Sequence, residues 1–287
     1  MQVTKAIIPC AGFGTRFLPV TKVIPKELLP IVDTPALLYI IDEAVKSGIH
    51  DILIVLSPKK RMIKRLFMPN VALNKALLMA KKDIEFALAN KKIDAKISFA
   101  VQRKMTGSAD AVLVAKKFCN NEPFAVLFGD DVMYSDTPVT RQLMDAFDKV
   151  GVSVVGCQLT SEEIARRCGV MLIKEKIDER ICKIDGIDEK PQGELASNLT
   201  SLGRFVLTPD IFDCIKHTKK TNGEVYLTDA ISLLAREGEG VCACTFEGRR
   251  YDIGNKQGYL EATVEFALRD DKLKDEFCKY LDTVIKD

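Results

Sequence analysis

The sequence has few of the residues from which metal centres are usually built. It contains only two histidines, His50 and His217, and its nine cysteines are scattered, with no pair in C-x-x-C spacing. A structural zinc site needs four such ligands, usually in closely spaced pairs. We therefore interpret most of the cysteines as small, buried apolar residues.

Long apolar runs are also missing. The longest one near the N-terminus covers residues 6–10, which is too short for the core of a signal peptide. Nowhere in the sequence does an apolar run reach the roughly 18 residues that a helix needs to span a bilayer. We therefore expect a soluble, cytoplasmic protein without a membrane partner.

Charge of one sign is not in excess either. Lysine and arginine total 42, aspartate and glutamate total 40, and the net charge is +2. This balance argues against a protein that coats a polyanion, and we expect no nucleic-acid partner. Positive charge for an anionic ligand must then come from particular loops.

The 287 residues carry an alternating pattern of secondary structure. Short β-branched runs predict strands at residues 5–9, 51–56, 96–101, 125–128 and 153–157. Helical stretches are predicted at residues 35–47 and 107–117. This alternation is typical of a parallel sheet with crossover helices.

The pattern changes after residue 169. Strands are predicted at residues 170–174, 181–187 and 202–207, and their short connections favour a β-rich extension of the sheet. Helices resume at residues 209 and 227, and residues 255–268 begin a helical C-terminus. We predict a single α/β domain over residues 1–287, with halves at about 1–150 and 151–255 and C-terminal helices at about 256–287.

Residues 71–92 predict one long helix. Leu77, Ile84 and Leu88 recur at helical spacing, with lysines on the opposite side. An amphipathic helix of this kind normally packs on its own domain with its charged face in solvent. We expect that arrangement here, and a subunit contact is the alternative.

A glycine-rich loop directly follows the first predicted strand. Its sequence is Ala11-Gly12-Phe13-Gly14-Thr15-Arg16-Phe17-Leu18-Pro19. Open α/β sheets place ligands at this point. Glycines let backbone N–H groups approach phosphate oxygens, and an arginine adds a planar set of donors. Taken alone, the loop fits an ordinary turn as well as a phosphate site.

The loop does not match the two common phosphate-binding patterns. Phe17 stands where a dinucleotide fingerprint has its third glycine, and no Gly-Lys-Ser/Thr of a phosphate loop is present. A dinucleotide-dependent dehydrogenase is therefore disfavoured.

The next segment frames one lysine between stiff residues. It reads Thr21-Lys22-Val23-Ile24-Pro25-Lys26-Glu27-Leu28-Leu29-Pro30. We expect the prolines, together with Pro19, to hold an extended path around Lys26. The run of residues 11–30 resembles the signature of the sugar-1-phosphate nucleotidylyltransferases. Residues 25–30 are similar to the bacterial branch of that family that uses UTP and glucose 1-phosphate.

The resemblance extends over about residues 3–270. It implies the nucleotide-diphospho-sugar transferase fold, which is a Rossmann-like mixed, mainly parallel sheet flanked by helices. The first half of the chain would bind the nucleotide, and the β-rich extension in the second half would bind the sugar. The resemblance also implies a homodimer or homotetramer.

The resemblance carries roles to individual residues. Those implied to bind the nucleotide are Ala11, Gly12, Gly14, Thr15, Glu27, Gln102 and Gly107. Those implied to bind the sugar are Gly169, Glu189, Asn198 and Gly203. Those implied to be catalytic are Arg16 at the β- and γ-phosphates, Lys26 at the α-phosphate and Lys190 at the sugar phosphate. Asp130 and Asp252 would hold Mg²⁺, which prefers carboxylate and phosphate oxygens, with Asp131 as a supporting neighbour.

The implied reaction is in-line attack by a sugar-phosphate oxygen on the α-phosphorus of the nucleotide. The attacking group is already an anion, so no general base is required. Catalysis must instead come from gathering two anions and stabilising the charge that develops, which suits Arg, Lys and a divalent ion.

Two departures from the family pattern leave the base open. Residues 107–111 read Gly-Ser-Ala-Asp-Ala where the branch usually has Gly-Leu-Gly-His-Ala, and Tyr226 stands where it usually has Gln. The same reaction with dTTP or another nucleotide or sugar is one alternative, and a non-catalytic sugar-nucleotide sensor is another. Thr228 and Asp229 fit either site residues or helix caps.

Overall fold

The computed structural model describes residues 2–221 and 223–284. In this part of the chain nine strands form one large sheet: β1 (Lys5–Cys10), β4 (Asp51–Leu56), β5 (Lys96–Val101), β6 (Phe124–Leu127), β8 (Ser153–Leu159), β9 (Gly169–Lys176), β10 (Ile181–Glu189), β11 (Leu199–Leu207) and β12 (Val241–Thr245). Their order in space is β5-β4-β1-β6-β11-β8-β12-β10-β9. Two small ribbons pair β2 (Pro30–Ile31) with β3 (Thr34–Pro35) and β7 (Asp131–Tyr134) with β13 (Arg249–Asp252).

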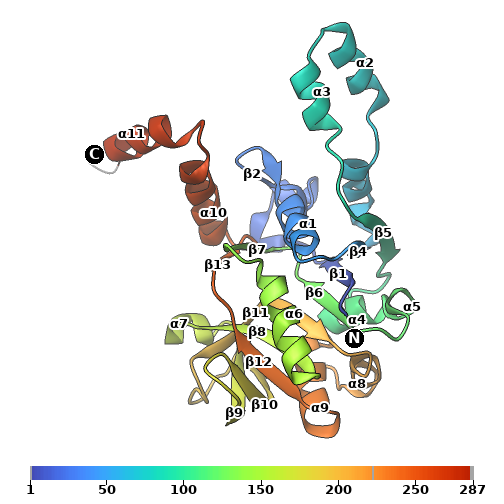
Figure 1. Cartoon of the computed structure of the whole chain (residues 1–287), viewed down its shortest axis with the longest axis vertical. Helices are drawn as coiled ribbons and strands as arrows, with labels where there is room; N and C mark the ends of the chain where they lie inside the picture. Colours follow the sequence, from blue (N-terminus) through green and yellow to red (C-terminus); the bar gives the residue numbers. More distant parts are fainter. Residues whose placement is uncertain (1, 222, 285–287) are drawn as a thin grey trace.

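Helices connect and cover these strands (Figure 1). The α-helices are α1 (Ala36–Lys46), α2 (Val71–Met79), α3 (Asp83–Ala89), α4 (Ser108–Leu113), α5 (Lys116–Cys119), α6 (Val139–Val150), α7 (Glu162–Ala165), α8 (Ile211–His217), α9 (Leu227–Glu237), α10 (Lys256–Arg269) and α11 (Lys274–Val284). The 3₁₀ segments are η1 (Thr15–Phe17), η2 (Val20–Lys22), η3 (Lys26–Leu28) and η4 (Pro58–Phe67).

The sheet is parallel in its first half and largely antiparallel in its second. β5, β4, β1 and β6 run parallel. From β11 onward the pairs are antiparallel, except for the parallel pair β12–β8. Antiparallel neighbours such as β9 and β10 need only a short connection, whereas parallel ones need a crossover. The mixed α/β fold is confirmed, and a mainly parallel arrangement holds for the first half.

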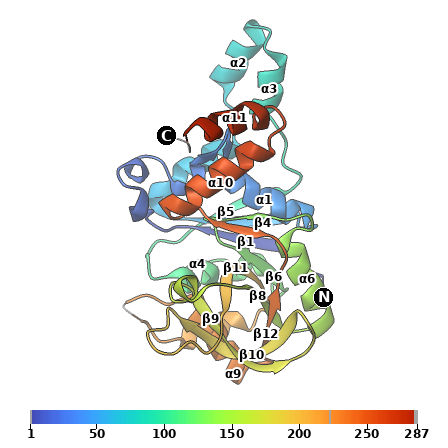
Figure 2. The same ribbon diagram turned by 90° about the vertical axis from the view of Figure 1, so that its left-hand side faces the viewer.

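Two hydrophobic clusters hold the sheet between helices. One gathers buried residues of α1 and α6 on one face, and the other gathers those of α4, α8 and α9 on the opposite face. The parallel strands are apolar nearly throughout, as β4 with residues 52–56 buried shows, because both of their faces are covered. Figure 2 shows the sheet edge-on between these layers.

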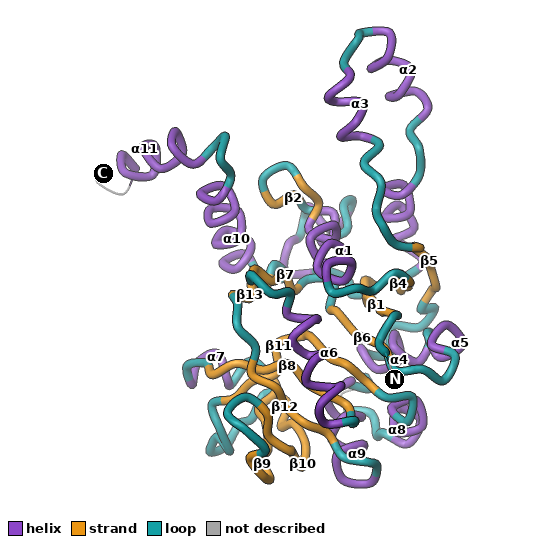
Figure 3. The backbone as a smooth tube through the Cα atoms, in the orientation of Figure 1, coloured by secondary structure: helices purple, strands orange, loops and turns teal. Residues whose placement is uncertain are grey.

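The expected long helix over residues 71–92 is wrong. The segment forms the two short helices α2 and α3, which are separated at Lys81, where φ is +55°. The tube in Figure 3 shows them as a hairpin that projects beyond the rest of the molecule. None of the described residues of either helix is buried, so packing on its own domain is also wrong. We call this hairpin, residues 71–89, the arm.

Other expectations needed smaller corrections. The segment around Lys26 is not extended, because η2 and η3 coil it into single turns. The helix expected over residues 107–117 breaks into α4 and α5. The sequence patterns did not indicate β7, β12 or β13. Among the described residues no helix is long and apolar enough to cross a bilayer.

Candidate active site

A cavity of about 370 Å³ opens where β1 ends. The loop after β1, the residues after β5 and β6, and the start of α4 line it. Carboxyl ends of parallel strands meet at one edge of a sheet, which brings these segments together. All seven residues predicted to bind a nucleotide line the cavity: Ala11, Gly12, Gly14, Thr15, Glu27, Gln102 and Gly107. Lys26 and Asp130 line it as well.

The glycine-rich loop turns sharply at Gly14. This residue has φ of +68°, and a Cβ there would lie 3.1 Å from the methyl group of Thr21. The Thr21 hydroxyl donates to the Gly14 carbonyl at 2.7 Å, so the turn is braced by the segment that leads to Lys26. Arg16 follows in η1, with its side chain 59% exposed and its Nη1 3.7 Å from Asp252 Oδ2.

Lys26 and Asp130 form an ion pair beside the cavity. Burial disfavours the charge on Asp130, but the Lys26 ammonium outweighs it and holds the pKa of Asp130 below its usual value. Burial likewise opposes the charge on Lys26, whereas Asp130 and then Glu27 raise the pKa of this lysine. Both groups are therefore charged at neutral pH, and the ion pair holds Lys26 in place.

Glu27 is fully buried and its carboxylate is held by a second lysine. Lys60 Nζ, in η4, donates to its two oxygens at 2.7 and 2.8 Å. Burial raises the pKa of Glu27 against the opposing charges of Lys60 and Lys26. Glu27 lines the cavity. Its carboxylate, however, is bound by Lys60 and so anchors η4 to the segment that carries Lys26. Nothing in the sequence around Lys60 signals this pairing across 33 residues.

The two predicted metal ligands converge on the space beside Gly254. A Cβ on Gly254 would lie 2.5 Å from Asp130 Oδ2 and 2.9 Å from Asp252 Oδ1, with Arg16 Nη2 at 3.2 Å. Glycine therefore leaves a cradle between two carboxylates. The described residues contain no cluster of three or more protein ligands suited to a metal. Two carboxylates completed by substrate phosphates fit Mg²⁺, which keeps few protein ligands.

Asp131 lies next to this cradle and is held by an arginine that the sequence analysis missed. Arg250 Nε donates to Asp131 Oδ1 at 2.7 Å. Burial raises the pKa of Asp131 to about 6, and Asp130 and Asp252 add to this while Arg250 opposes it. A signal was available, because Arg250 precedes Asp252 by two residues and strand residues at i and i+2 share a face.

Gly203 makes room for Asp131. Its φ is +79°, and a Cβ there would lie 2.1 Å from Asp131 Oδ2. Its predicted contact with a sugar stays a prediction, since the space that it leaves is used by this carboxylate.

The predicted sugar-binding residues meet at the paired ends of β9 and β10. Gly169 is opposite Glu189 in the ladder, and a Cβ on Gly169 would lie 3.0 Å from Glu189 Oε2. Burial raises the pKa of Glu189, while a hydrogen bond with the Thr228 side chain lowers it. Lys190 follows with φ of +53°, a backbone conformation that non-glycine residues adopt mainly at functional sites and tight turns. Asn198 is exposed just before β11, and its role stays a prediction.

The helix-cap interpretation of Thr228 and Asp229 is wrong. α9 begins at Leu227, whose N–H donates to Ser108 Oγ at 3.0 Å. Thr228 instead contacts Glu189, and the Thr221 hydroxyl donates to Asp229 Oδ2 at 3.4 Å.

The end of the cavity away from the ion pairs is built around Gln102. Its side chain is nearly buried, and its Nε2 donates to the Gly107 carbonyl at 3.0 Å and to Asp110 Oδ2 at 3.2 Å. Both partners only accept hydrogen bonds, which fixes the orientation of the amide. A Cβ on Gly107 would lie 2.2 Å from the carbonyl oxygen of Val225, so only glycine fits at this position.

The three cationic residues predicted to be catalytic lie in different parts of the site. Arg16 and Lys26 lie with Asp130 and Asp252 at the cradle. Lys190 lies in the second half, where its N–H donates to the Cys168 carbonyl at 3.0 Å. Burial raises the pKa of Cys168, with further contributions from Arg250, Asp131, Glu189 and Asp252.

Comparison with known proteins points to one family. A family model described as nucleotidyl transferase matches residues 5–268. A protein of Staphylococcus haemolyticus named UTP–glucose-1-phosphate uridylyltransferase is 42% identical over 98% of both chains. A Staphylococcus saprophyticus protein named UTP–glucose-1-phosphate uridylyltransferase 1 is 41% identical over the full length of both.

Solved structures agree with the sequence relatives. A UTP-bound UGPase from Acinetobacter baumannii superposes with a TM-score of 0.90 at 31% identity, covering 98% of this chain and 99% of the other. A UDP-glucose pyrophosphorylase complexed with UDP-glucose gives a TM-score of 0.82 at 34% identity, covering 94% and 100%.

Proposed function

This chain belongs to the nucleotidyl transferase family, and on that basis we propose that it transfers a uridylyl group from UTP to glucose 1-phosphate. The products are UDP-glucose and pyrophosphate. The observation that carries the proposal is the cavity at the end of β1, which collects the glycine-rich loop, Gln102, Lys26 and Asp130. Relatives with 41–42% identity over at least 98% of their length bear the name of this activity.

The cationic side chains account for the chemistry at the phosphates. A phosphate oxygen of glucose 1-phosphate attacks the α-phosphorus of UTP, and the bond to the leaving pyrophosphate breaks. We assign Lys26 to the α-phosphate and Arg16 to the β- and γ-phosphates. Lys26 is mostly buried and held by Asp130, so little reorganisation is needed when negative charge develops.

The second half of the chain supplies the sugar side. We assign Lys190 to the phosphate of glucose 1-phosphate and Glu189 to the sugar hydroxyls, with Asn198 as a further polar contact. Gly169 lets the sugar ring approach the backbone next to Glu189, which lies opposite it in the ladder. Thr228 orients the Glu189 carboxylate.

We assign Asp130 and Asp252 to magnesium. Bound there, the ion would neutralise charge on the phosphates of both substrates. Gly254 keeps the space between the carboxylates open, and its N–H donates to Asp252 Oδ1 at 2.9 Å, which fixes the orientation of that carboxylate.

The contacts of Gln102 leave dTTP as a second candidate nucleotide. The Gln102 Nε2 is taken up by Gly107 and Asp110, which leaves its Oε1 to accept an N–H from the base. Uracil and thymine both offer N3–H. The base-binding contact therefore does not separate UTP from dTTP.

The test is release of pyrophosphate from UTP, dTTP, GTP, CTP and ATP, each with glucose 1-phosphate and Mg²⁺. We expect UTP to give the highest kcat/KM, with dTTP next. A preference for dTTP would replace the assigned nucleotide and keep the reaction. Binding of UDP-glucose without turnover of any nucleotide would instead indicate a non-catalytic sensor.

We also propose that the chain forms a homodimer or homotetramer through the arm. α2 and α3 have nine and seven residues, which is too short for a stable isolated helix. Such helices are normally stabilised by burying an apolar face, yet most of the large apolar side chains of the arm are exposed. These are Val71, Leu73, Leu78, Met79, Ile84 and Leu88. A partner surface is therefore needed to cover them.

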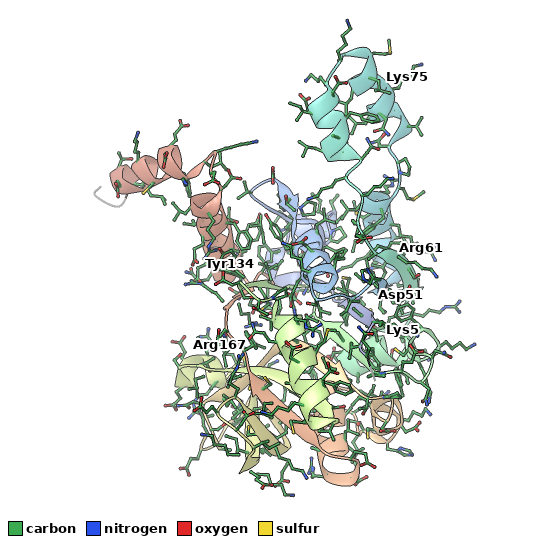
Figure 4. All side chains as sticks on the ribbon, viewed as in Figure 1. Lys5, Asp51, Arg61, Lys75, Tyr134 and Arg167 are labelled. Atoms are coloured by element: carbon green, nitrogen blue, oxygen red, sulfur yellow. The ribbon has the colours of Figure 1, made fainter. Side chains whose placement is uncertain are left out.

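A second copy of the chain offers a matching surface. Residues 71–92 contain five lysines and two acidic residues, whereas residues 270–284 contain five acidic residues and three lysines. That C-terminal segment also exposes Leu273, Tyr280 and Val284. The arm and α11 project from the same end of the molecule (Figure 1). Figure 4 shows Lys75 near the tip of the arm, pointing away from the body.

A further inference from the structure

The two carboxylates assigned to magnesium are carried by one short ribbon. β7 and β13 pair antiparallel with Asp131 opposite Asp252, and Ile253 N–H donates to the Asp130 carbonyl at 3.0 Å. Asp130 and Asp252 therefore lie at the same end of the ribbon. In the described part of the chain the ribbon pairs with no strand of the large sheet. A two-stranded ribbon is only marginally stable by itself, so side-chain contacts must fix its position.

Asp131 makes several of these contacts. Arg250, on the partner strand of the ribbon, donates from Nε to Asp131 Oδ1 at 2.7 Å, and its Nη2 lies 2.5 Å from the same oxygen in an ion pair. Arg204, on β11 of the large sheet, donates from Nη2 to the Asp131 carbonyl at 2.7 Å. Gly203 leaves space for Asp131 Oδ2. Asp131 thus connects both strands of the ribbon to the large sheet.

Arg204 is itself fixed from the helical layer. Its guanidinium donates to both carboxylate oxygens of Glu43 in α1, at 2.6 to 3.1 Å. Glu43 also accepts from the Thr140 hydroxyl at 2.7 Å and from its N–H at 3.0 Å. The contact chain therefore runs from α1 and α6 through β11 to the ribbon, and each buried charge along it has a partner.

Arg250 is the cation that pairs with Asp131 in a group of three carboxylates. Asp130, Asp131 and Asp252 repel one another at this short range, and burial strengthens the repulsion. Burial lowers the pKa of Arg250, but the charges of Asp131 and then Asp252 raise it further than burial lowers it. Its side chain is 20% exposed, and that of Asp131 is 5% exposed.

We propose that Arg250 is a positioning residue for the magnesium site. Its guanidinium holds Asp131 and so keeps Asp130 and Asp252 converging on the space beside Gly254. This inference rests on the proposed function, because it assigns a metal to those two carboxylates. Replacing a residue that hydrogen-bonds to a metal ligand, or otherwise orients it, typically lowers metal affinity about 10- to 100-fold.

The test is binding of Mn²⁺, followed by the electron paramagnetic resonance of the free ion, with UTP present and glucose 1-phosphate absent. We expect Arg250→Met to weaken Mn²⁺ binding about 10- to 100-fold and Arg250→Lys to weaken it less. UTP binding measured without metal should stay unchanged. Asp252→Asn, which removes an assigned ligand, is the positive control for lost binding.

Arg249→Met is the matched negative control. Arg249 is the neighbouring residue on the same strand, and its Nη2 lies 2.5 Å from Glu265 of α10. The substitution Arg249→Met removes the same charge as Arg250→Met does. Its replacement should leave Mn²⁺ binding unchanged. Thermal unfolding of each variant separates a local effect from loss of the fold. If Arg250→Met does not fold, Arg250→Lys and Asp131→Asn provide the same comparison.

A double variant tests the route of the effect. Asp131→Asn keeps an acceptor oxygen but removes the charge, and with Arg250→Met it should weaken Mn²⁺ binding no further than Arg250→Met alone, because both act through one contact. Additive losses, or Mn²⁺ binding by Arg250→Met that matches wild type, would overturn the inference. A wild-type chain that binds Mn²⁺ in an Arg250-dependent way but forms no UDP-glucose would overturn the proposed function and leave this inference standing.

Discussion

At the scale of single residues, space decides which side chains the site accepts. Gly107, Gly203 and Gly254 each lie so close to a neighbouring oxygen that an added Cβ would collide with it, at 2.1 to 2.5 Å. For Gly254 the neighbour is the carboxylate of Asp130 in the proposed metal site, and for Gly203 it is the carboxylate of the adjacent Asp131. The carboxylates of Asp131 and Asp130 therefore pack against Gly203 and Gly254, where no larger residue fits, and this packing fixes the orientation of their oxygens.

Lys26 gives the sharpest prediction at this scale. Lys26→Ala should lower kcat about 100- to 1,000-fold, which is the usual effect of removing one donor that stabilises transition-state charge. Steady-state pyrophosphate release is the measurement. Lys22→Ala is the matched control, because Lys22 lies exposed in the same segment and should keep normal turnover. A kcat for Lys26→Ala within a few-fold of wild type would remove Lys26 from the mechanism.

The residues that could be predicted from sequence lie in continuous motifs. Residues 11–30 place the glycine-rich loop and Lys26 together along the chain, and the structure keeps them on one cavity. Lys60 and Arg250 were missed because each acts through a partner more than 30 residues away. Charge pairing over such distances depends on how the chain folds back on itself. No local pattern marks Lys60, and the one local signal for Arg250 is its position two residues before Asp252.

At the scale of elements, the pattern of apolar residues in the sequence predicted most strands of the large sheet. It did not predict the β7–β13 ribbon or the hairpin form of the arm. β4 has the predicted bounds because buried parallel strands are nearly all apolar, and the edge strand β5 also has the predicted bounds although none of its residues is buried. β7 and β13 have four residues each and contain charged residues, so no apolar alternation marks them. The arm kept helical spacing, but a short break at Lys81 folds it back on itself.

The attachment of η4 gives a prediction for an element. Lys60→Met should destabilise the protein by about 3–5 kcal/mol, because it leaves the Glu27 carboxylate buried without a partner. Unfolding in urea measures this change. Lys59→Met, at the exposed neighbouring position, should have almost no effect. Replacing both partners, as Lys60→Met with Glu27→Leu, should recover much of the loss, and a cost below about 1 kcal/mol for Lys60→Met would show that the pair does not anchor η4.

At the scale of the whole molecule, contacts within a single chain do not explain what stabilises the arm and the C-terminal helix α11. Both consist of helices without a buried residue among those described. Their opposite charge balance and exposed apolar side chains make them complementary to each other in a second copy. The assembly of the protein therefore depends on parts far from the cavity.

The assembly prediction follows from these exposed side chains. The wild-type chain of 31.9 kDa should sediment as a dimer or tetramer, and Leu78→Glu with Ile84→Glu should shift it to the monomer. Leu159→Glu is the control, because Leu159 is 77% exposed, as Ile84 is, but lies at the end of β8. An arm variant that keeps the assembly would contradict the proposal. So would a monomeric wild type that binds anionic lipid vesicles, which would assign the arm to a membrane surface.

The single large sheet has a mechanical consequence for how substrates enter. The first and second halves of the chain are joined where β6 pairs with β11, through a ladder of residues 124–127 with residues 204–207. A hinge that swung the halves apart would have to break this ladder in the middle of the core. Substrate entry and release should therefore involve the surface loops, while the two halves of the sheet keep a fixed position relative to each other.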